Sequence, residues 1–185
     1  RSHDTKDDSI PPVLADGGAP ATSDELLAYL ETLGIDAVTH EHEPVFTVEE
    51  AQAAKGDLPG AHTKNLFVRD KRGRMWIVVA LHDRDLDLLA LSNTLRSMGL
   101  ATGRLSFASR ERLMRFLGLT PGAVSPFALI NDRGGQVRVA LDTGLRDQEI
   151  WNAHPLTNDR TTALRTEDML RFLEAVNHPP VWIEV

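Results

Sequence analysis

Apolar residues recur every three or four positions in several segments of the chain, which is the spacing of one face of a helix. Leu26, Leu30 and Leu33 form such a stripe after Ser23, a residue type that caps helices, and Gly34 then ends it. The same reasoning predicts further helices at residues 47–54, 87–98, 109–117 and 166–176. The residues expected to face the core from the helix over 87–98 are Leu88, Leu91, Leu95 and Met98.

Strand-like runs lie between these helices. Residues 65–69 and 75–81 flank Asp70-Lys71-Arg72-Gly73, a turn sequence that predicts a hairpin. Residues 127–130 and 137–141 flank a second turn sequence, so we expect a second hairpin with Asp132 in its turn. Shorter strands are expected at residues 35–41 and 181–185. Because hairpins dominate, we predict an α/β fold with a mixed, mostly antiparallel sheet surrounded by helices.

The first twenty residues lack this periodicity. They contain several acids, three prolines and the pair Gly17-Gly18. We therefore predict a disordered tail over residues 1–20 and one folded domain over residues 21–185.

Composition narrows the classes of protein. Hydrophobic residues make up 42% of the 185 residues and charged residues 25%, as in ordinary globular domains. No apolar run approaches the ~18 residues needed to cross a bilayer, and no signal-peptide core is visible, so we expect a cytoplasmic protein without membrane contact. The absence of cysteine excludes disulfides, thiolate metal sites and a cysteine nucleophile.

Charge is unevenly distributed. The chain carries a net charge of −7, which argues against broad, nonspecific affinity for nucleic acid. Residues 64–74, however, carry a local charge of +4, and residues 104–115 carry +3. Each run is either a solvated surface or a face for phosphates. In the second case Arg110, Arg112 and Arg115 are the candidates for contact with RNA.

The segment from Leu117 to Asp132 is the most informative part of the chain. Gly118 suits a left-handed helix end, while Pro121 and Pro126 fix backbone angles on either side of Gly122. Such a rigid loop can present the backbone amides of its central residues, Ala123, Val124 and Ser125, to a small ligand.

Histidines are candidates for acid–base or metal chemistry. His40 and His42 alternate along an expected strand, but no third metal ligand is spaced convincingly, so a strand-end surface is the simpler interpretation and we expect no metal. His154 precedes Pro155 in a loop that also contains Asn158 and Thr161. That loop is either structural or the wall of a pocket.

Two further residues leave alternatives open. Ser125 is not flanked by the glycines of a nucleophile elbow, so it is a weak candidate for a covalent nucleophile, although its hydroxyl or amide can contact a substrate. Lys64 precedes an apolar strand. It is either an edge charge or a compact cation for a phosphate or a terminal ribose.

Three segments together resemble the YbaK-like aminoacyl-tRNA deacylases, and among them the freestanding ProXp-ala or PrdX branch that edits mischarged prolyl tRNA. The segments are His62-Thr63-Lys64-Asn65-Leu66-Phe67, the loop over residues 117–132, and His154-Pro155 with Asn158 and Thr161. Their order and spacing hold from about residue 23 to residue 185. One departure is Ala128, which stands where many relatives have glycine.

The resemblance implies a fold like the editing domain of prolyl-tRNA synthetase and hydrolysis of the ester of Ala-tRNA(Pro), without a cofactor. The family's lysine falls on Lys64, and its G-x-x-x-P loop runs from Gly122 to Pro126. The residues with an implied catalytic role are Lys64, Gly122, Ala123, Val124 and Ser125. The residues implied to bind the substrate are Asn65, Pro126, Phe127, His154 and Asn158.

Alternatives remain at this stage. The substrate is Ala-tRNA(Pro), Cys-tRNA(Pro) or a wider range of small aminoacyl groups. A protein of another class, a non-catalytic module that binds tRNA or a synthetase, also fits the resemblance. The expected partners are the acceptor end of mischarged tRNA(Pro) and prolyl-tRNA synthetase, and a monomer is the default expectation.

Overall fold

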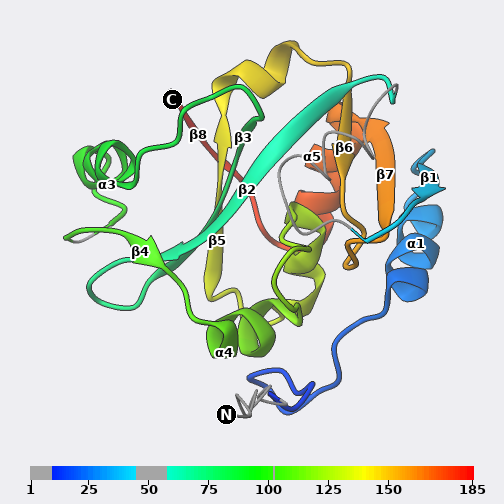
Figure 1. Cartoon of the computed structure of the whole chain (residues 1–185), viewed down its shortest axis with the longest axis horizontal. Helices are drawn as coiled ribbons and strands as arrows, with labels where there is room; N and C mark the ends of the chain where they lie inside the picture. Colours follow the sequence, from blue (N-terminus) through cyan, green and yellow to red (C-terminus); the bar gives the residue numbers. More distant parts are fainter. Residues whose placement is uncertain (1–9, 45–57, 102) are drawn as a thin grey trace, which may run out of the picture.

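An eight-stranded mixed sheet with helices on both faces makes up the protein (Figure 1). The computed structural model describes residues 10–44, 58–101 and 103–185. The helices are α1 (Ser23–Thr32), α3 (Leu88–Ser97), α4 (Arg110–Arg112) and α5 (Thr166–Ala175), with a π-helical η1 (Leu113–Leu117) and 3₁₀ helices η2 (Pro126–Asn131) and η3 (Thr143–Asp147). The strands are β1 (Val38–Glu41), β2 (Ala61–Arg69), β3 (Met75–Leu81), β4 (Ser106–Phe107), β5 (Val137–Asp142), β6 (Ile150–Ala153), β7 (Arg160–Arg165) and β8 (Val181–Ile183). No helix in this part of the chain is long and apolar enough to span a bilayer.

The strand order is β1-β7-β6-β2-β3-β5-β8, with β4 paired to the end of β2. The β2–β3 hairpin is confirmed, and its turn is closed by the buried carboxylate of Asp70, which accepts from the amides of Arg72 and Arg74. The expectation of a mixed sheet is confirmed, although β6–β2, β3–β5 and β5–β8 are parallel pairs. β3 and β5 are parallel because a crossover, and not a hairpin, connects them.

The second predicted hairpin is wrong. Residues 127–130 lie in the 3₁₀ helix η2, and β5 pairs with β3 and β8. Pro126 fits the first turn of a helix, and Ser125 caps it by accepting a hydrogen bond from the Phe127 amide at 3.2 Å. An apolar run of this length has no periodicity that separates a buried strand from a buried helix.

Asp132 is buried and does not belong to a hairpin turn. It is 5% exposed, its Oδ1 accepts from the Gln136 amide, and its Oδ2 accepts from the Val137 amide and from His178 Nε2. The carboxylate therefore joins η2, the start of β5 and the segment after α5.

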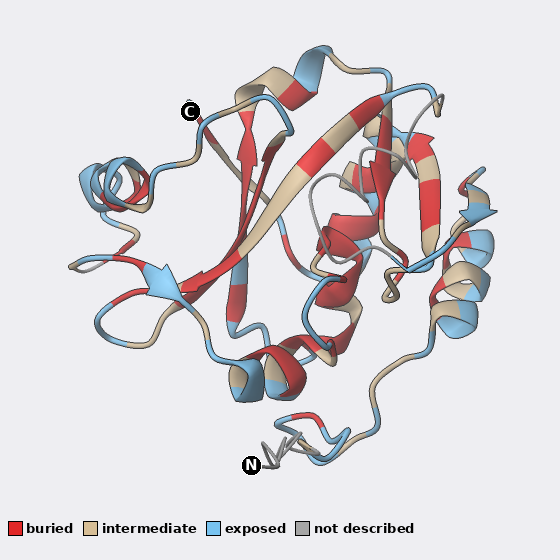
Figure 2. Ribbon diagram, viewed as in Figure 1, coloured by how far each residue is buried: buried red, intermediate tan, exposed pale blue. Residues whose placement is uncertain are grey.

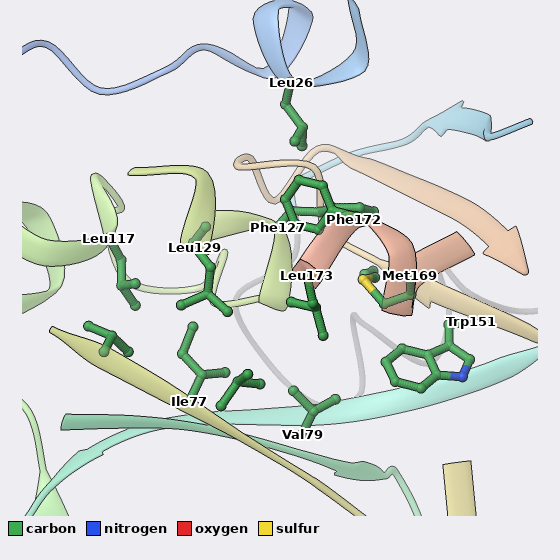
Figure 3. Packing of buried hydrophobic residues seen from close by; sticks show 14 of the residues in the cluster. Leu26, Ile77, Val79, Leu117, Phe127, Leu129, Trp151, Met169, Phe172 and Leu173 are labelled. Atoms are coloured by element: carbon green, nitrogen blue, oxygen red, sulfur yellow. The ribbon is translucent and has the colours of Figure 1, made fainter. Parts of the chain in front are cut away.

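Two apolar clusters cover the two faces of the sheet. The larger lies between the sheet and α1, η1, η2 and α5 (Figure 3), where the rings of Phe127 and Phe172 meet edge to face with centroids 5.4 Å apart. The smaller packs Leu91 and Leu95 of α3 against Trp76 and Val78 of β3. On β2 the adjacent Phe67 and Val68 are both buried, Phe67 in the larger cluster and Val68 in the smaller, because both faces of the strand are covered there (Figure 2).

Several local expectations need correction. Thr22, not Ser23, caps α1, because Thr22 and Glu25 form a reciprocal capping box. Met98 ends α3 with 44% of its surface exposed, so it is not a core residue. The first strand begins at Val38 and not at residue 35. The helix expected over residues 47–54 lies outside the described residues.

Residues 10–20, the part of the predicted tail that the structure describes, contact the folded domain. Leu14 is 3% exposed, the Ala15 amide donates to the Arg115 carbonyl at 2.7 Å, and Asp16 pairs with Arg133 at 3.0 Å. Residues 10–15 and the α4–η1 region also line an open groove of about 500 Å³. The buried Leu14, the hydrogen bond of the Ala15 amide and the ion pair of Asp16 thus attach this segment to the folded domain.

Candidate functional site

The loop that the sequence singled out is clamped at both ends by one side chain. Gly118 ends η1 with φ +65°, as predicted, and a methyl group added there would lie 2.6 Å from Asn131 Nδ2. Asn131 Nδ2 donates to the Leu117 carbonyl at 2.9 Å, and Asn131 Oδ1 accepts from the Ala21 amide at 2.9 Å. The loop from Gly118 to Ser125 is therefore held between η1 and η2 as a rigid body.

Backbone amides in this loop are available as donors. Pro121 and Gly122 form a turn, with Gly122 at φ +99°. The amides of Gly122, Val124 and Ser125 donate to no acceptor among the described residues. Because oriented amides of this kind can stabilise a developing negative charge, the loop has the chemistry of an oxyanion-binding site.

Ser125 joins the loop to the end of β6. Its hydroxyl donates to the His154 carbonyl at 2.7 Å and accepts from the Phe127 amide, and the residue is 0% exposed. With both hydrogen-bonding directions used inside the protein, the hydroxyl is a positioning group. Only the backbone amide of Ser125 remains to act on a ligand.

Lys64 and His154 project from the same face of the sheet. β2 and β6 run in parallel, with Ala61 opposite Trp151 and His62 opposite Asn152. Since side chains alternate with a period of two, Lys64 and His154, each two residues further along, lie on the face of His62 and Asn152. The pairing ends at this point, and β2 and β6 diverge beyond it (Figure 1).

The Lys64 ammonium group is anchored by a main-chain carbonyl. Lys64 Nζ donates to the Arg84 carbonyl at 2.6 Å. Arg84 Nε in turn pairs with Asp142 Oδ2 at 3.1 Å, and Asp142, 1% exposed, also accepts from the amides of Leu81 and Gly144. The buried Asp142 carboxylate thus fixes the segment around Arg84, and the Arg84 carbonyl in turn fixes the Lys64 side chain.

His154 is oriented by its own hairpin. It is half-buried, and its Nδ1 donates to the Arg160 carbonyl at 2.9 Å, which fixes the orientation of the ring. The Arg160 side chain binds Asp24 of α1 at 2.8 Å, and this hydrogen bond raises the pKa of Arg160. The hairpin that carries His154 is therefore tied to α1.

The other predicted substrate-binding residues lie in three different places. Asn65 lies on the opposite face of β2 from Lys64, where its Nδ2 donates to Thr63 Oγ1 at 3.0 Å and its buried Oδ1 has no partner. Asn158 lies half-buried in the turn between β6 and β7. Pro126 and Phe127 are buried, and Phe127 packs on Phe172, so these two support the loop from inside.

Two further residues contribute to this region: His42, which the sequence placed at a strand-end surface, and Asn152, which the sequence did not single out. The His42 ring centroid lies 6.3 Å from that of His154, and Thr161 Oγ1 donates to His42 Nε2 at 2.8 Å. Asn152 binds the carbonyls of Pro59 and Ala61 through Nδ2, while its buried Oδ1 has no partner. The sequence could have indicated Asn152, because it is a polar residue within the otherwise apolar strand β6 (Ile150–Ala153). No group of side chains suited to a metal ion occurs in the described part of the chain.

Comparisons with known proteins agree on one family. A family model described as an aminoacyl-tRNA editing domain matches residues 42–172. The chain is 38% identical over 162 residues to prolyl-tRNA synthetase associated domain-containing protein 1 of Xenopus laevis, covering 86% of this chain and 94% of that protein. It is also 38% identical over 151 residues to the prolyl-tRNA editing protein ProX of Acetoanaerobium sticklandii, covering 81% of this chain and 89% of that protein.

A solved structure shares the fold. The crystal structure of a proposed trans-editing enzyme for prolyl tRNA synthetase superimposes with a TM-score of 0.63 at 20% identity, covering 90% of this chain and 99% of that chain. At this level of identity the likeness concerns the fold alone.

Proposed function

This chain belongs to the family of aminoacyl-tRNA editing domains, and from that premise we propose that it is a trans-editing hydrolase whose substrate is mischarged Ala-tRNA(Pro). The observation that carries the proposal is the rigid loop whose amides at Gly122, Val124 and Ser125 have no acceptor among the described residues. Ser125 ties this loop to His154, and His154 shares a face of the sheet with Lys64.

The reaction requires little from the protein. An aminoacyl ester is already activated, so the enzyme needs to place a water molecule and to stabilise the oxyanion that forms on the carbonyl. The water oxygen bonds to the carbonyl carbon, the ester bond to the ribose breaks, and the ribose oxygen takes the proton. The neighbouring hydroxyl of the terminal ribose orients the water, so no side chain has to act as the base.

Each group then has one task in this mechanism. The amides of the loop from Gly122 to Ser125 receive the oxyanion, and losing one such donor typically costs about 2.7–4 kcal/mol of transition-state stabilisation. Lys64, held by the Arg84 carbonyl, binds the tRNA terminus. His154 and Asn158 line the substrate region in this proposal, whereas Asn65 faces the other side of β2 and supports the strand through Thr63.

Selection of alanine follows from size. A synthetase pocket shaped for proline cannot reject the smaller alanine strongly, whereas an editing pocket can reject proline by steric clash. The rigid backbone of the loop from Gly118 to Ser125 suits such exclusion, because it cannot relax to admit a ring-constrained side chain.

The deciding experiment compares hydrolysis of Ala-, Cys-, Ser- and Pro-tRNA(Pro) by the purified protein. We expect Ala-tRNA(Pro) to be cleaved fastest and Pro-tRNA(Pro) to survive. Faster cleavage of Cys-tRNA(Pro), or equal cleavage of all small aminoacyl groups, would replace the alanine assignment with a cysteine-specific or broader deacylase.

A second candidate is a non-catalytic module that binds tRNA or prolyl-tRNA synthetase, and the name of the Xenopus laevis relative gives it support. The unpartnered amides favour catalysis, because a pure binding module has no use for an oxyanion site. Equal affinity for charged and uncharged tRNA(Pro), with no ester cleavage, would establish the module in place of the hydrolase.

A further inference from the structure

Two basic segments that are far apart in the sequence meet at one end of the β2–β3 hairpin. β4 pairs antiparallel with the end of β2, with Ser106 opposite Arg69 and Phe107 opposite Val68. The Ala108 amide continues this contact by donating to the Phe67 carbonyl at 3.0 Å. Figure 1 shows β4 beside the end of β2, with α4 following it directly. Arg104, two residues before β4, and Arg110, three residues after it, are thereby brought to the end of the hairpin that carries Arg69.

The turn of the β2–β3 hairpin lies close to the segment before β4 and to α4. A methyl group placed on Gly103 would lie 3.0 Å from the Lys71 side chain, and one placed on Gly73 would lie 3.7 Å from Arg112 Nη2. The residues brought together in this way, called the basic cluster below, are Arg69, Lys71, Arg72, Arg104, Arg110 and Arg112.

The basic cluster has no internal charge partner. Among the described residues, none of its six cations makes an ion pair with a carboxylate. The buried Asp70 is paired with Arg74, and Glu111 is the acid within the second basic run. Six neighbouring cations in a chain of net charge −7 concentrate a positive potential in one place, which is the arrangement that attracts a polyanion.

We propose that the basic cluster binds the phosphate backbone of the RNA acceptor stem, behind the single-stranded end that enters the site. This inference rests on the proposed function. Lys64 and Arg69 belong to the same strand, and at about 3.3 Å per residue they lie about 17 Å apart. The cluster is thus too far from Lys64 to contact the ester-bearing nucleotide, and contacts nucleotides further along the same chain.

The chemistry of the surface favours RNA over an acidic peptide. Five of the six cations are arginines, whose planar heads bind phosphate through two parallel hydrogen bonds. Phe107, 63% exposed, presents an aromatic ring on β4, between Arg104 and Arg110 in the sequence, and surfaces that contact nucleic acid often contain such a ring. Lys71 and Arg72 lie in the turn directly beyond Arg69, so the cluster occupies the end of the strand that carries Lys64.

The test compares two triple variants of the full chain that change the net charge equally. One replaces three exposed members of the cluster, Lys71→Ala, Arg72→Ala and Arg110→Ala. The control replaces three exposed arginines elsewhere, Arg133→Ala, Arg146→Ala and Arg165→Ala. Each is assayed with full-length Ala-tRNA(Pro) and with an alanyl ester of a short CCA oligonucleotide, which ends before the cluster. Binding of uncharged tRNA is measured over a range of salt concentrations.

For the cluster variant we expect KM for full-length Ala-tRNA(Pro) to rise on the order of tenfold, kcat to stay unchanged, and turnover of the short ester to match wild type. The slope of log affinity against log salt should fall by about two to three, since each phosphate contact contributes a little under one. An unchanged KM and salt slope, or displacement of tRNA by polyglutamate as readily as by unrelated RNA, would overturn the proposal. If the wild type cleaves neither ester, the proposed function fails, and the binding measurement still decides the cluster.

Discussion

The Ser125 hydroxyl donates a 2.7 Å hydrogen bond to the main-chain carbonyl of His154, linking two segments 29 residues apart in the sequence. Ser125 also caps η2 through the Phe127 amide, so one buried side chain fixes both the loop and the end of β6. The Ser125 side chain therefore sets the distance between the loop amides and His154.

We expect Ser125→Ala to slow deacylation of Ala-tRNA(Pro) by about tenfold without abolishing it, because the amides that receive the oxyanion remain in place. The free energy of unfolding should fall by about 2 kcal/mol, since the buried His154 carbonyl loses its donor. Single-turnover kinetics and urea unfolding measure the two effects. Ser109→Ala, which removes the exposed cap of α4, is the control and should leave the rate unchanged. Complete loss of activity in Ser125→Ala, with a trapped acyl-enzyme in the wild type, would instead make the hydroxyl a nucleophile.

Lys64→Ala should nearly abolish deacylation while the fold stays intact. The side chain is half-buried, and among the described residues it makes one hydrogen bond, to the Arg84 carbonyl. Its removal therefore costs the structure little, whereas the tRNA terminus loses its cation. Arg96→Ala, which removes an exposed cation from α3, controls for the change in net charge. Turnover of the Lys64 variant at the wild-type rate, with an unchanged circular dichroism spectrum, would remove this lysine from the mechanism.

The helices and the first hairpin could be predicted because their signals are local. The capping residue Asp87, the stripe of Leu91 and Leu95, and the turn after Arg69 each lie within the element that they specify. η2 could not be predicted in this way, because Pro126 and the apolar residues after it are compatible with a buried strand or a buried helix. Its choice depends on the Ser125 cap and on packing against α5.

The site itself depends on long-range register. The sequence identified Lys64 and His154 separately, but only the parallel pairing of β2 with β6 places them on one face. The basic runs were visible as charge, whereas their convergence depends on β4, a strand of two residues without a periodic signal. Asp132 was misassigned for a similar reason, since its partner His178 lies 46 residues away.

A substitution at Gly144 should change the position of the Lys64 side chain without altering Lys64 itself. Its backbone does not require glycine, but an added methyl group would lie 2.6 Å from Arg84 Nη2, so Gly144→Ala should push the Arg84 head off Asp142. Because the Arg84 carbonyl anchors Lys64, we expect deacylation to fall on the order of tenfold with a small change in stability. Gly134→Ala, where the nearest atom lies at an ordinary 3.5 Å, is the matched control. Identical rates for the two variants would show that the position of Arg84 does not control the lysine.

Asp132 and Asp16 allow a buried carboxylate contact to be compared with an exposed one. Asp132 contacts His178 at 2.8 Å with both side chains 3% exposed, while Asp16 contacts Arg133 at 3.0 Å with about half of each side chain exposed. Removing Asp132 leaves His178 and two backbone amides without an acceptor, whereas the partners of Asp16 turn to water.

We therefore expect Asp132→Ala to lower the free energy of unfolding by about 3–5 kcal/mol and Asp16→Ala to lower it by less than about 1 kcal/mol. Urea unfolding of both variants in the same buffer provides the comparison, and 1 M salt should weaken only the Asp16 pair. Equal costs for the two variants would mean that the buried pair is dispensable. The contact between η2, β5 and the segment after α5 would then depend on apolar packing alone.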